Sequence, residues 1–149
     1  MLRGHTRSVR TAARIAIVED DDAIRTVLED VLEEEGYTCL ARTSAESGLE
    51  LLERQRPDLV ILDIVLGGRP AGLMLLDQLG QDSFSAAIPV IVCTADNSAL
   101  VTDQMVLRER GIYCLAKPFD VQELLHLIKN ALDHQLMLSK GRATRQVAS

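Results

Sequence analysis

The feature that most constrains the fold is a short apolar run that ends in a carboxylate. Residues 59–62 (Leu-Val-Ile-Leu) follow Pro57 and lead directly into Asp63. An uninterrupted apolar run of this length indicates a strand buried on both faces, as in the middle of a parallel sheet. Functional residues of open parallel sheets gather at the carboxyl ends of the strands. Asp63 is therefore the first candidate for a functional residue.

Strand-like and helix-like segments alternate five times along the chain, with short connections. The expected strands are residues 14–18, 37–41, 59–63, 88–93 and 112–116. Apolar residues at helical spacing follow each of them. This alternation predicts parallel strands with helices on both faces. We expect an α/β fold, a flavodoxin-like (βα)5 doubly wound parallel sheet with strand order 2-1-3-4-5.

Capping residues locate the starts of several helices. Asp21 or Asp22 suits the N-cap of the first helix, and Asp120 suits the N-cap of the last one. Thr43 has Glu46 three residues later, which predicts a capping box at the start of the second helix.

Length and charge indicate one acidic domain with basic ends. A chain of 149 residues favours a single domain, and we expect a flexible basic N-terminal tail (1–13), a folded domain (14–134) and a C-terminal tail (135–149). Both ends carry arginine or lysine without acids, so the segment between them is more acidic than the net charge of −6 suggests. An acidic domain of this kind is not expected to bind nucleic acid directly.

The cysteines and the hydropathy pattern favour a cytoplasmic protein. Cys39, Cys93 and Cys114 are odd in number, widely spaced and placed in apolar segments, which is typical of buried thiols in a reducing compartment. No apolar run is long enough to span a bilayer, and no secretory signal precedes the first strand. We therefore expect no membrane association.

Polar residues follow the expected strands at one edge of the sheet. Glu19 and Asp20 end the first strand, Asp63 the third, Thr94 the fourth and Lys117 the fifth. In the expected strand order the three carboxylates come together, and two like charges about 4 Å apart cost roughly 4 kcal/mol near a surface. A hard divalent cation offsets this repulsion, and Mg²⁺ suits a few carboxylates completed by water and phosphate oxygens.

The same residues suit phosphoryl transfer. A carboxylate such as Asp63 acts as a nucleophile in forming an aspartyl phosphate, and Lys117 and Thr94 supply a cation and a hydroxyl for the phosphoryl oxygens. Taken singly, each residue has a simpler interpretation as a helix cap, a surface lysine or a turn residue. Their joint placement at successive strand ends is more specific.

These motifs resemble the response-regulator receiver domain of bacterial two-component signalling. The matching segments are residues 17–21 (Ile-Val-Glu-Asp-Asp), 62–66 (Leu-Asp-Ile-Val-Leu), 92–95 (Val-Cys-Thr-Ala) and 117–120 (Lys-Pro-Phe-Asp). The resemblance covers about residues 14–134. It implies a phosphorylated signalling domain rather than an enzyme that turns over a substrate.

The resemblance also implies roles for the acidic residues. Asp63 would accept a phosphoryl group from a phosphohistidine on a sensor histidine kinase or a histidine phosphotransfer protein. Asp20 would bind Mg²⁺ directly, Glu19 through water, and the Val65 carbonyl would be a third protein ligand. Phosphorylation of Asp63 would alter the binding of a downstream protein through a surface formed by residues 98–134. Phosphorylation-dependent dimerisation is one form that this binding would take.

Thr94 and Lys117 would bind the phosphoryl oxygens, and Thr94 would also act as a switch. The second switch position of the family, usually aromatic, is Cys114 here. We expect Cys114 to be a passive packing residue, with Tyr113 on the opposite face of the sheet by strand alternation. The start of the helix after Thr94 would then move.

The loop after Asp63 departs from the family pattern. Gly67 stands where the family usually has proline, and Gly72 comes one residue later than the usual glycine. These differences concern the conformation of the loop and leave the acceptor position unchanged.

Other functions are less consistent with the sequence. Phosphatases of the haloacid-dehalogenase type need a second aspartate two residues after the nucleophile, where this chain has Val65. A degenerate receiver would bind partners without phosphorylation, but all five site residues are present. The chain is either a stand-alone receiver or a fragment of a larger regulator or hybrid kinase.

Overall fold

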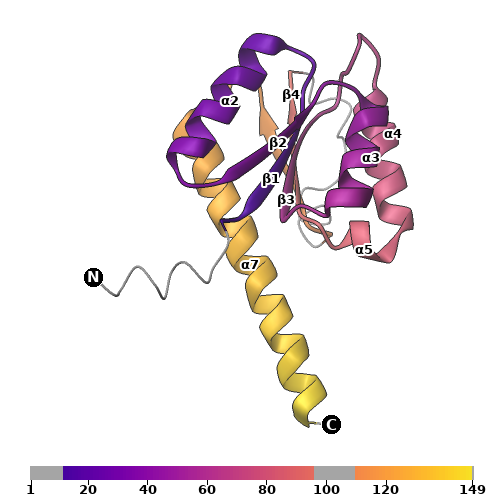
Figure 1. The fold of residues 1–149 in the computed structure, drawn as a ribbon, viewed down its shortest axis with the longest axis vertical. Coiled ribbons are helices and arrows are strands. Elements are labelled where there is room, and N and C mark those ends of the chain that lie inside the picture. Colours follow the sequence, from indigo (N-terminus) through magenta and orange to yellow (C-terminus); the bar gives the residue numbers. More distant parts are fainter. Residues whose placement is uncertain (1–11, 96–109, 149) are drawn as a thin grey trace.

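The computed structural model describes residues 12–95 and 110–148, which form a five-stranded parallel sheet flanked by helices. The strand order is β2-β1-β3-β4-β5, so the predicted flavodoxin-like order is confirmed, and β1 and β3 are neighbours (Figure 1). The strands are β1 (Arg14–Val18), β2 (Thr38–Arg42), β3 (Leu59–Asp63), β4 (Val90–Thr94) and β5 (Ile112–Ala116).

Helices cover both faces of this sheet. The helices are α2 (Asp22–Glu34), α3 (Ala45–Gln55), α4 (Ala71–Gln81), the short α5 (Ser83–Ala86) and α7 (Val121–Ala148). Helices α2 and α7 lie on one face, and α3 and α4 lie on the other (Figure 1). The helix expected from residue 98 lies outside the described residues.

Side-chain alternation along the strands divides the core into two halves. Odd-numbered residues of β1 and β3, such as Ile17 and Ile61, pack against Leu28 of α2 and Leu124 of α7. Even-numbered residues pack with α3 and α4 on the other face. All five residues of β3 are buried, because this strand is covered on both faces. The apolar run that ends in Asp63 is thus the central strand, as predicted.

A side chain caps the start of α2 and the start of α3. Asp21 is the N-cap of α2 and accepts a hydrogen bond from the Ile24 amide at 3.0 Å, as expected. The capping box predicted for Thr43 and Glu46 is wrong. The N-cap of α3 is Ser44, whose hydroxyl accepts from the Ser47 amide at 3.2 Å. The chain enters α3 one residue later than predicted.

The last helix continues beyond the expected end of the domain at residue 134. It runs for 28 residues to Ala148 and projects away from the sheet (Figure 1). Leucine, methionine, lysine and arginine near its end are good helix formers, and no proline interrupts the segment. Within the described residues, no helix is both long enough and apolar enough to cross a membrane.

Candidate functional site

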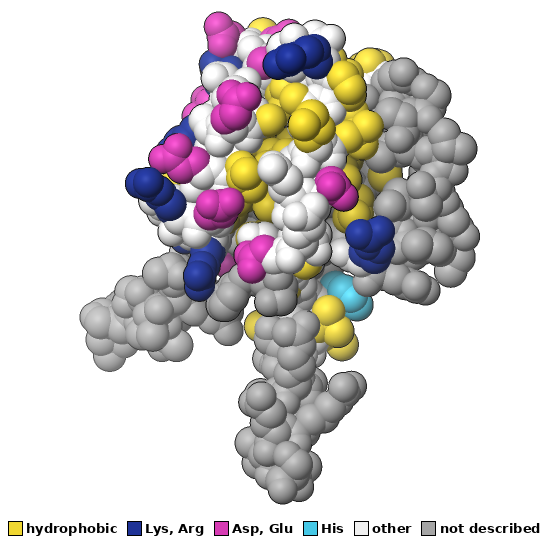
Figure 2. Space-filling model, turned by 90° about the vertical axis from the view of Figure 1, so that its right-hand side faces the viewer, with side chains coloured by type: hydrophobic (Ala, Val, Ile, Leu, Met, Phe, Trp, Pro, Cys, Tyr) yellow, Lys and Arg dark blue, Asp and Glu magenta, His cyan; other side chains and the backbone are white. Residues whose placement is uncertain are grey.

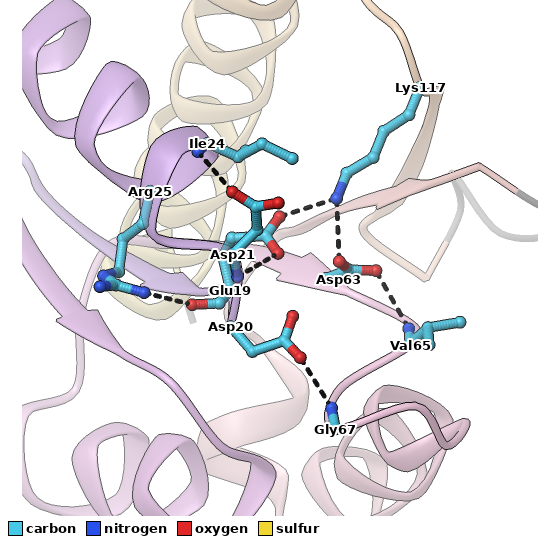
Figure 3. A network of polar contacts seen from close by, with 9 residues as sticks. All are labelled: Glu19, Asp20, Asp21, Ile24, Arg25, Asp63, Val65, Gly67 and Lys117. Carbon is cyan, nitrogen blue, oxygen red and sulfur yellow. Dashed lines mark hydrogen bonds and ion pairs between the residues drawn. The ribbon is translucent and has the colours of Figure 1, made fainter.

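Strand alternation places three charged side chains on the same side of the sheet. Glu19 directly follows β1, Asp63 ends β3, and Lys117 directly follows β5. The Glu19 amide donates to the Arg42 carbonyl at 3.1 Å, which extends the pairing of β1 with β2 by one residue. All three residues continue the odd-numbered pattern that faces α2 and α7. Figure 3 shows their side chains converging at the carboxyl edge of the sheet.

Lys117 joins the two buried carboxylates. Its Nζ donates to Glu19 Oε1 at 2.7 Å and to Asp63 Oδ2 at 2.8 Å. The side chains of Glu19 and Asp63 are only 4% and 10% exposed. Charges this poorly hydrated need a partner, and one ammonium supplies hydrogen bonds to both.

Asp20 completes an acidic cluster from the exposed side. Carboxylate oxygens of Glu19, Asp20 and Asp63 all lie within 4.8 Å of one another. Asp20 Oδ2 accepts a hydrogen bond from the backbone amide of Gly67 at 2.8 Å (Figure 3). The predicted convergence of these three carboxylates from two neighbouring strands is thus present in the structure.

Burial and neighbouring charge change the acidity of the cluster. Burial raises the pKa of Glu19 above its ordinary value, and the nearby Asp63 carboxylate raises it further, while the Lys117 ammonium opposes this. Burial alone would lower the pKa of Lys117, but its hydrogen bonds to Asp63 and Glu19 outweigh that effect and raise it. Lys117 therefore stays protonated at neutral pH.

Residues at the start of α2 hold Glu19 in place through hydrogen bonds. The Asp21 amide donates to Glu19 Oε2 at 3.2 Å, and Arg25 donates from its guanidinium to the Glu19 backbone carbonyl at 3.1 Å. Arg25 is held in turn by an ion pair with Asp22. Both oxygens of the Glu19 carboxylate are thus engaged, one with Lys117 and one with the helix start.

This set of donors fits a hard divalent cation. Three carboxylates with oxygens within 4.8 Å of one another provide oxygen ligands and an excess of negative charge that one lysine does not cancel. Val65 lies beside the cluster, with its amide donating to Asp63 Oδ1 at 3.0 Å. The predicted role of the Val65 carbonyl as a ligand stays a prediction.

The two predicted switch residues lie on neighbouring strands. Thr94 ends β4 opposite Ala116 of β5, and its side chain lies outside the described part of the structure. Cys114 pairs with Val92 and packs with the α3 and α4 side of the core. Tyr113 packs with the α2 and α7 side. The opposite orientation predicted for these two residues is confirmed.

The contact between Gly67 and Asp20 was not predicted. Residues 66 and 69 exchange backbone hydrogen bonds of 2.9 and 3.2 Å around Gly67 and Gly68, both at positive φ. Two adjacent glycines followed shortly by a proline are a turn signal. The turn was therefore detectable from the sequence, but its contact with Asp20, 47 residues away, was not.

Comparison with known proteins identifies the family. Residues 15–129 match the family model described as "Response regulator receiver domain". The chain belongs to this family, and it is a receiver domain of the kind used in two-component systems, as its motifs, fold and acidic cluster indicate.

Relatives of different length share this domain. PilH of Pseudomonas aeruginosa is 34% identical over 121 residues, which cover 80% of this chain and 98% of PilH. The transcriptional regulator NtrC of Escherichia coli is 36% identical over 118 residues, or 79% of this chain, but the match spans only 24% of NtrC.

Solved structures show the same fold. A response regulator of Chloroflexus aurantiacus gives a TM-score of 0.70 at 33% identity, covering 82% of this chain and 98% of that one. The receiver domain of the Pseudomonas aeruginosa sensor kinase PA1611, which has a magnesium ion in its active-site cleft, gives 0.69 at 26% identity with the same coverage.

Proposed function

We propose that Asp63 is the phosphoacceptor of this receiver domain. The observation that carries the proposal is the pairing of Asp63 Oδ2 with Lys117 Nζ at 2.8 Å beside Glu19 and Asp20. Asp63 ends the central strand, so its carboxylate is held at the sheet edge by a rigid element. A nucleophile fixed in this way needs little reorganisation to attack.

The proposed transfer is a single displacement at phosphorus. A carboxylate oxygen of Asp63 attacks phosphorus, the P–N bond of the phosphohistidine breaks, and the bond electrons return to the imidazole nitrogen, which takes a proton from water. Lys117, which contacts Asp63, would balance the charge of the phosphoryl oxygens, and Thr94 would donate its hydroxyl to one of them.

Glu19, Asp20 and Asp63 would hold Mg²⁺, with the Val65 carbonyl as a further ligand. When bound, Mg²⁺ supplies positive charge that offsets the carboxylates and the phosphoryl oxygens. Glu19 is already engaged by Lys117 and by the Asp21 amide, which supports an indirect role through water.

The partners follow from this chemistry. The donor would be a sensor histidine kinase or a histidine phosphotransfer protein in the cytoplasm, and a downstream protein would recognise the phosphorylated form. The match covers 98% of PilH and 24% of NtrC, so it is compatible with a stand-alone receiver and equally with a part of a larger regulator.

The decisive experiment is phosphorylation by acetyl phosphate, followed by intact-mass measurement. Wild-type protein with Mg²⁺ should gain one phosphoryl group, and Asp63→Asn should gain none. The matched control is Asp58→Asn, directly before the start of the same strand, where the carboxylate accepts from the Arg14 amide. This control should be phosphorylated normally.

Two results would contradict the proposal. Labelling that persists in Asp63→Asn would place the acceptor elsewhere. Wild-type protein that stays unlabelled with acetyl phosphate and also with a phosphorylated histidine donor would favour a module that binds partners without phosphorylation.

A further inference from the structure

The loop between β3 and α4 contains a tight hairpin that contacts the acidic cluster. Leu66 and Arg69 exchange both backbone hydrogen bonds, with Gly67 at φ +62° and Gly68 at φ +74° between them. A two-residue connection with positive φ at both central positions suits glycine. A Cβ at either glycine would meet no atom within 4 Å, so there is space for a side chain. The positive φ of the backbone is therefore the reason why glycine suits these two positions.

This hairpin presents one backbone donor to a predicted metal ligand. The Gly67 amide donates to Asp20 Oδ2 at 2.8 Å. Within residues 12–95 and 110–148, this is the one hydrogen bond that the Asp20 side chain accepts. The other two carboxylates of the cluster share Lys117 instead. The orientation of Asp20 therefore depends on the hairpin.

A carboxylate held at one oxygen keeps its other oxygen for a metal ion. Each carboxylate has about four acceptor sites, so a bond from Gly67 to Oδ2 is compatible with metal coordination through Oδ1. Hydrogen-bonded partners of metal ligands fix the ligand geometry, and their loss typically weakens metal binding about 10–100-fold. Proline at residue 67 would have no N–H to donate, and its φ near −65° is incompatible with the turn.

We propose that the Gly67 amide is a positioning group for Mg²⁺ binding, holding Asp20 in its ligand orientation and coupling metal occupancy to the conformation of the 66–69 hairpin. The inference rests on the proposed Mg²⁺ site. Linkage makes the coupling reciprocal, so bound Mg²⁺ stabilises the hairpin to the same extent that the intact hairpin strengthens Mg²⁺ binding.

The first test compares Mg²⁺ dissociation constants by calorimetry for the wild type, Gly67→Pro and Gly67→Asn. Asparagine tolerates positive φ and keeps its amide, so Gly67→Asn should bind Mg²⁺ within about twofold of the wild type. Gly67→Pro should bind at least about tenfold more weakly. Equal affinity in all three folded proteins would overturn the proposal.

The second test measures amide hydrogen exchange by NMR without Mg²⁺, and it does not depend on the stability of Gly67→Pro. The Gly67 amide should exchange at least about tenfold faster in Asp20→Ala than in the wild type, because it loses its acceptor. The Gly36 amide, which donates to the Glu33 carbonyl at 3.0 Å, is the internal control and should not change. Unchanged exchange at Gly67 would also overturn the proposal.

Different results would contradict the Mg²⁺ site and the role of Gly67. Wild-type protein that does not bind Mg²⁺ would overturn the metal site and the proposed function with it. Wild-type protein that binds Mg²⁺, with Gly67→Pro binding equally well, would overturn only the role assigned to Gly67.

Discussion

Lys117 determines the electrostatic balance of the site at the residue scale. Its side chain is 16% exposed, and its ammonium lies within hydrogen-bond distance of two carboxylates that are themselves almost buried. Removal of one charged partner leaves the remaining buried charges uncompensated. The resulting loss of folding free energy is larger than the net stabilisation that the ion pair provides. Lys117 is therefore a stabilising residue as well as a candidate ligand of the phosphoryl group.

Lys117→Met should destabilise the metal-free protein by about 2 kcal/mol, less than for a fully buried pair because water still reaches the site. Urea unfolding without divalent ions measures this. The double variant with Asp63→Asn should lose less than the sum of the single changes, since the two residues are in contact. Strict additivity would mean that this ion pair does not contribute to folding.

Glu19 gives the metal-free protein a specific pH dependence. Its pKa in the folded protein is raised above the ordinary value of 4.5, chiefly by burial. Between the ordinary and the raised pKa, Glu19 is protonated to a greater extent in the folded protein than in the unfolded chain, so its contribution to the free energy of unfolding falls as pH rises through this range. Glu19→Gln should flatten this dependence, as measured by urea unfolding at several pH values from 4.5 upward.

The control for this measurement is Glu53→Gln, a change at an exposed position of α3. It should keep the wild-type dependence on pH. A Glu19→Gln profile that runs parallel to the wild type would show that burial of Glu19 has no effect on its titration in the folded state.

The helix α4 constrains the site at the scale of elements. Gly72, in its first turn, donates to the Ile64 carbonyl at 2.8 Å, and a Cβ there would lie 2.2 Å from the Asp63 carbonyl oxygen. The helix thus packs directly onto the backbone that carries Asp63. The neighbouring atoms are backbone and cannot move aside without displacing the end of β3.

Gly72→Ala should therefore destabilise the protein by about 3 kcal/mol, as an overpacked contact. Gly80→Ala is the matched control in the same helix, because the nearest atom to its Cβ is the end of Arg110 at 3.8 Å. That change should stabilise by up to about 1 kcal/mol, since alanine has the higher helix propensity. Chemical unfolding measures the stability of both variants. Similar changes in the free energy of unfolding for Gly72→Ala and Gly80→Ala would contradict this prediction.

The strands and helices could be predicted from the periodicity of the sequence. The N-cap of α3 and the contact between Gly67 and Asp20 could not, because they depend on the path of the backbone. Strand order and the convergence at Asp63 follow from alternating elements. Thr43 and Ser44 are adjacent cap formers, each with a polar residue three positions later, and only the chain path selects Ser44. The donor in the Gly67 contact is a backbone amide, which leaves no signature in the side-chain pattern.

Charge and apolar surface are unevenly distributed at the scale of the whole molecule. On the face that carries α4, Figure 2 shows hydrophobic side chains gathered beside acidic ones, and Met74 of α4 is 68% exposed. Hydrophobic side chains also appear on the helix below the domain (Figure 2). Leu136 and Met137 of α7 are 53% and 71% exposed, in contrast to the buried Ile128 more than two turns earlier. The helix has therefore left the core before residue 138.

A chain ending at Leu138 should consequently keep the stability of the full chain within about 0.5 kcal/mol, because the removed segment follows residues that are already exposed. A chain ending at Leu127 should not fold, because it lacks Ile128 and Ala131, which are 0% and 1% exposed against the sheet. Urea unfolding at two protein concentrations measures both effects.

A loss above about 2 kcal/mol in the longer truncated chain would show that the end of α7 stabilises the fold. If the stability of the full chain also increased with protein concentration, that contact would be made by a second copy of the chain, since only an intermolecular contact depends on concentration.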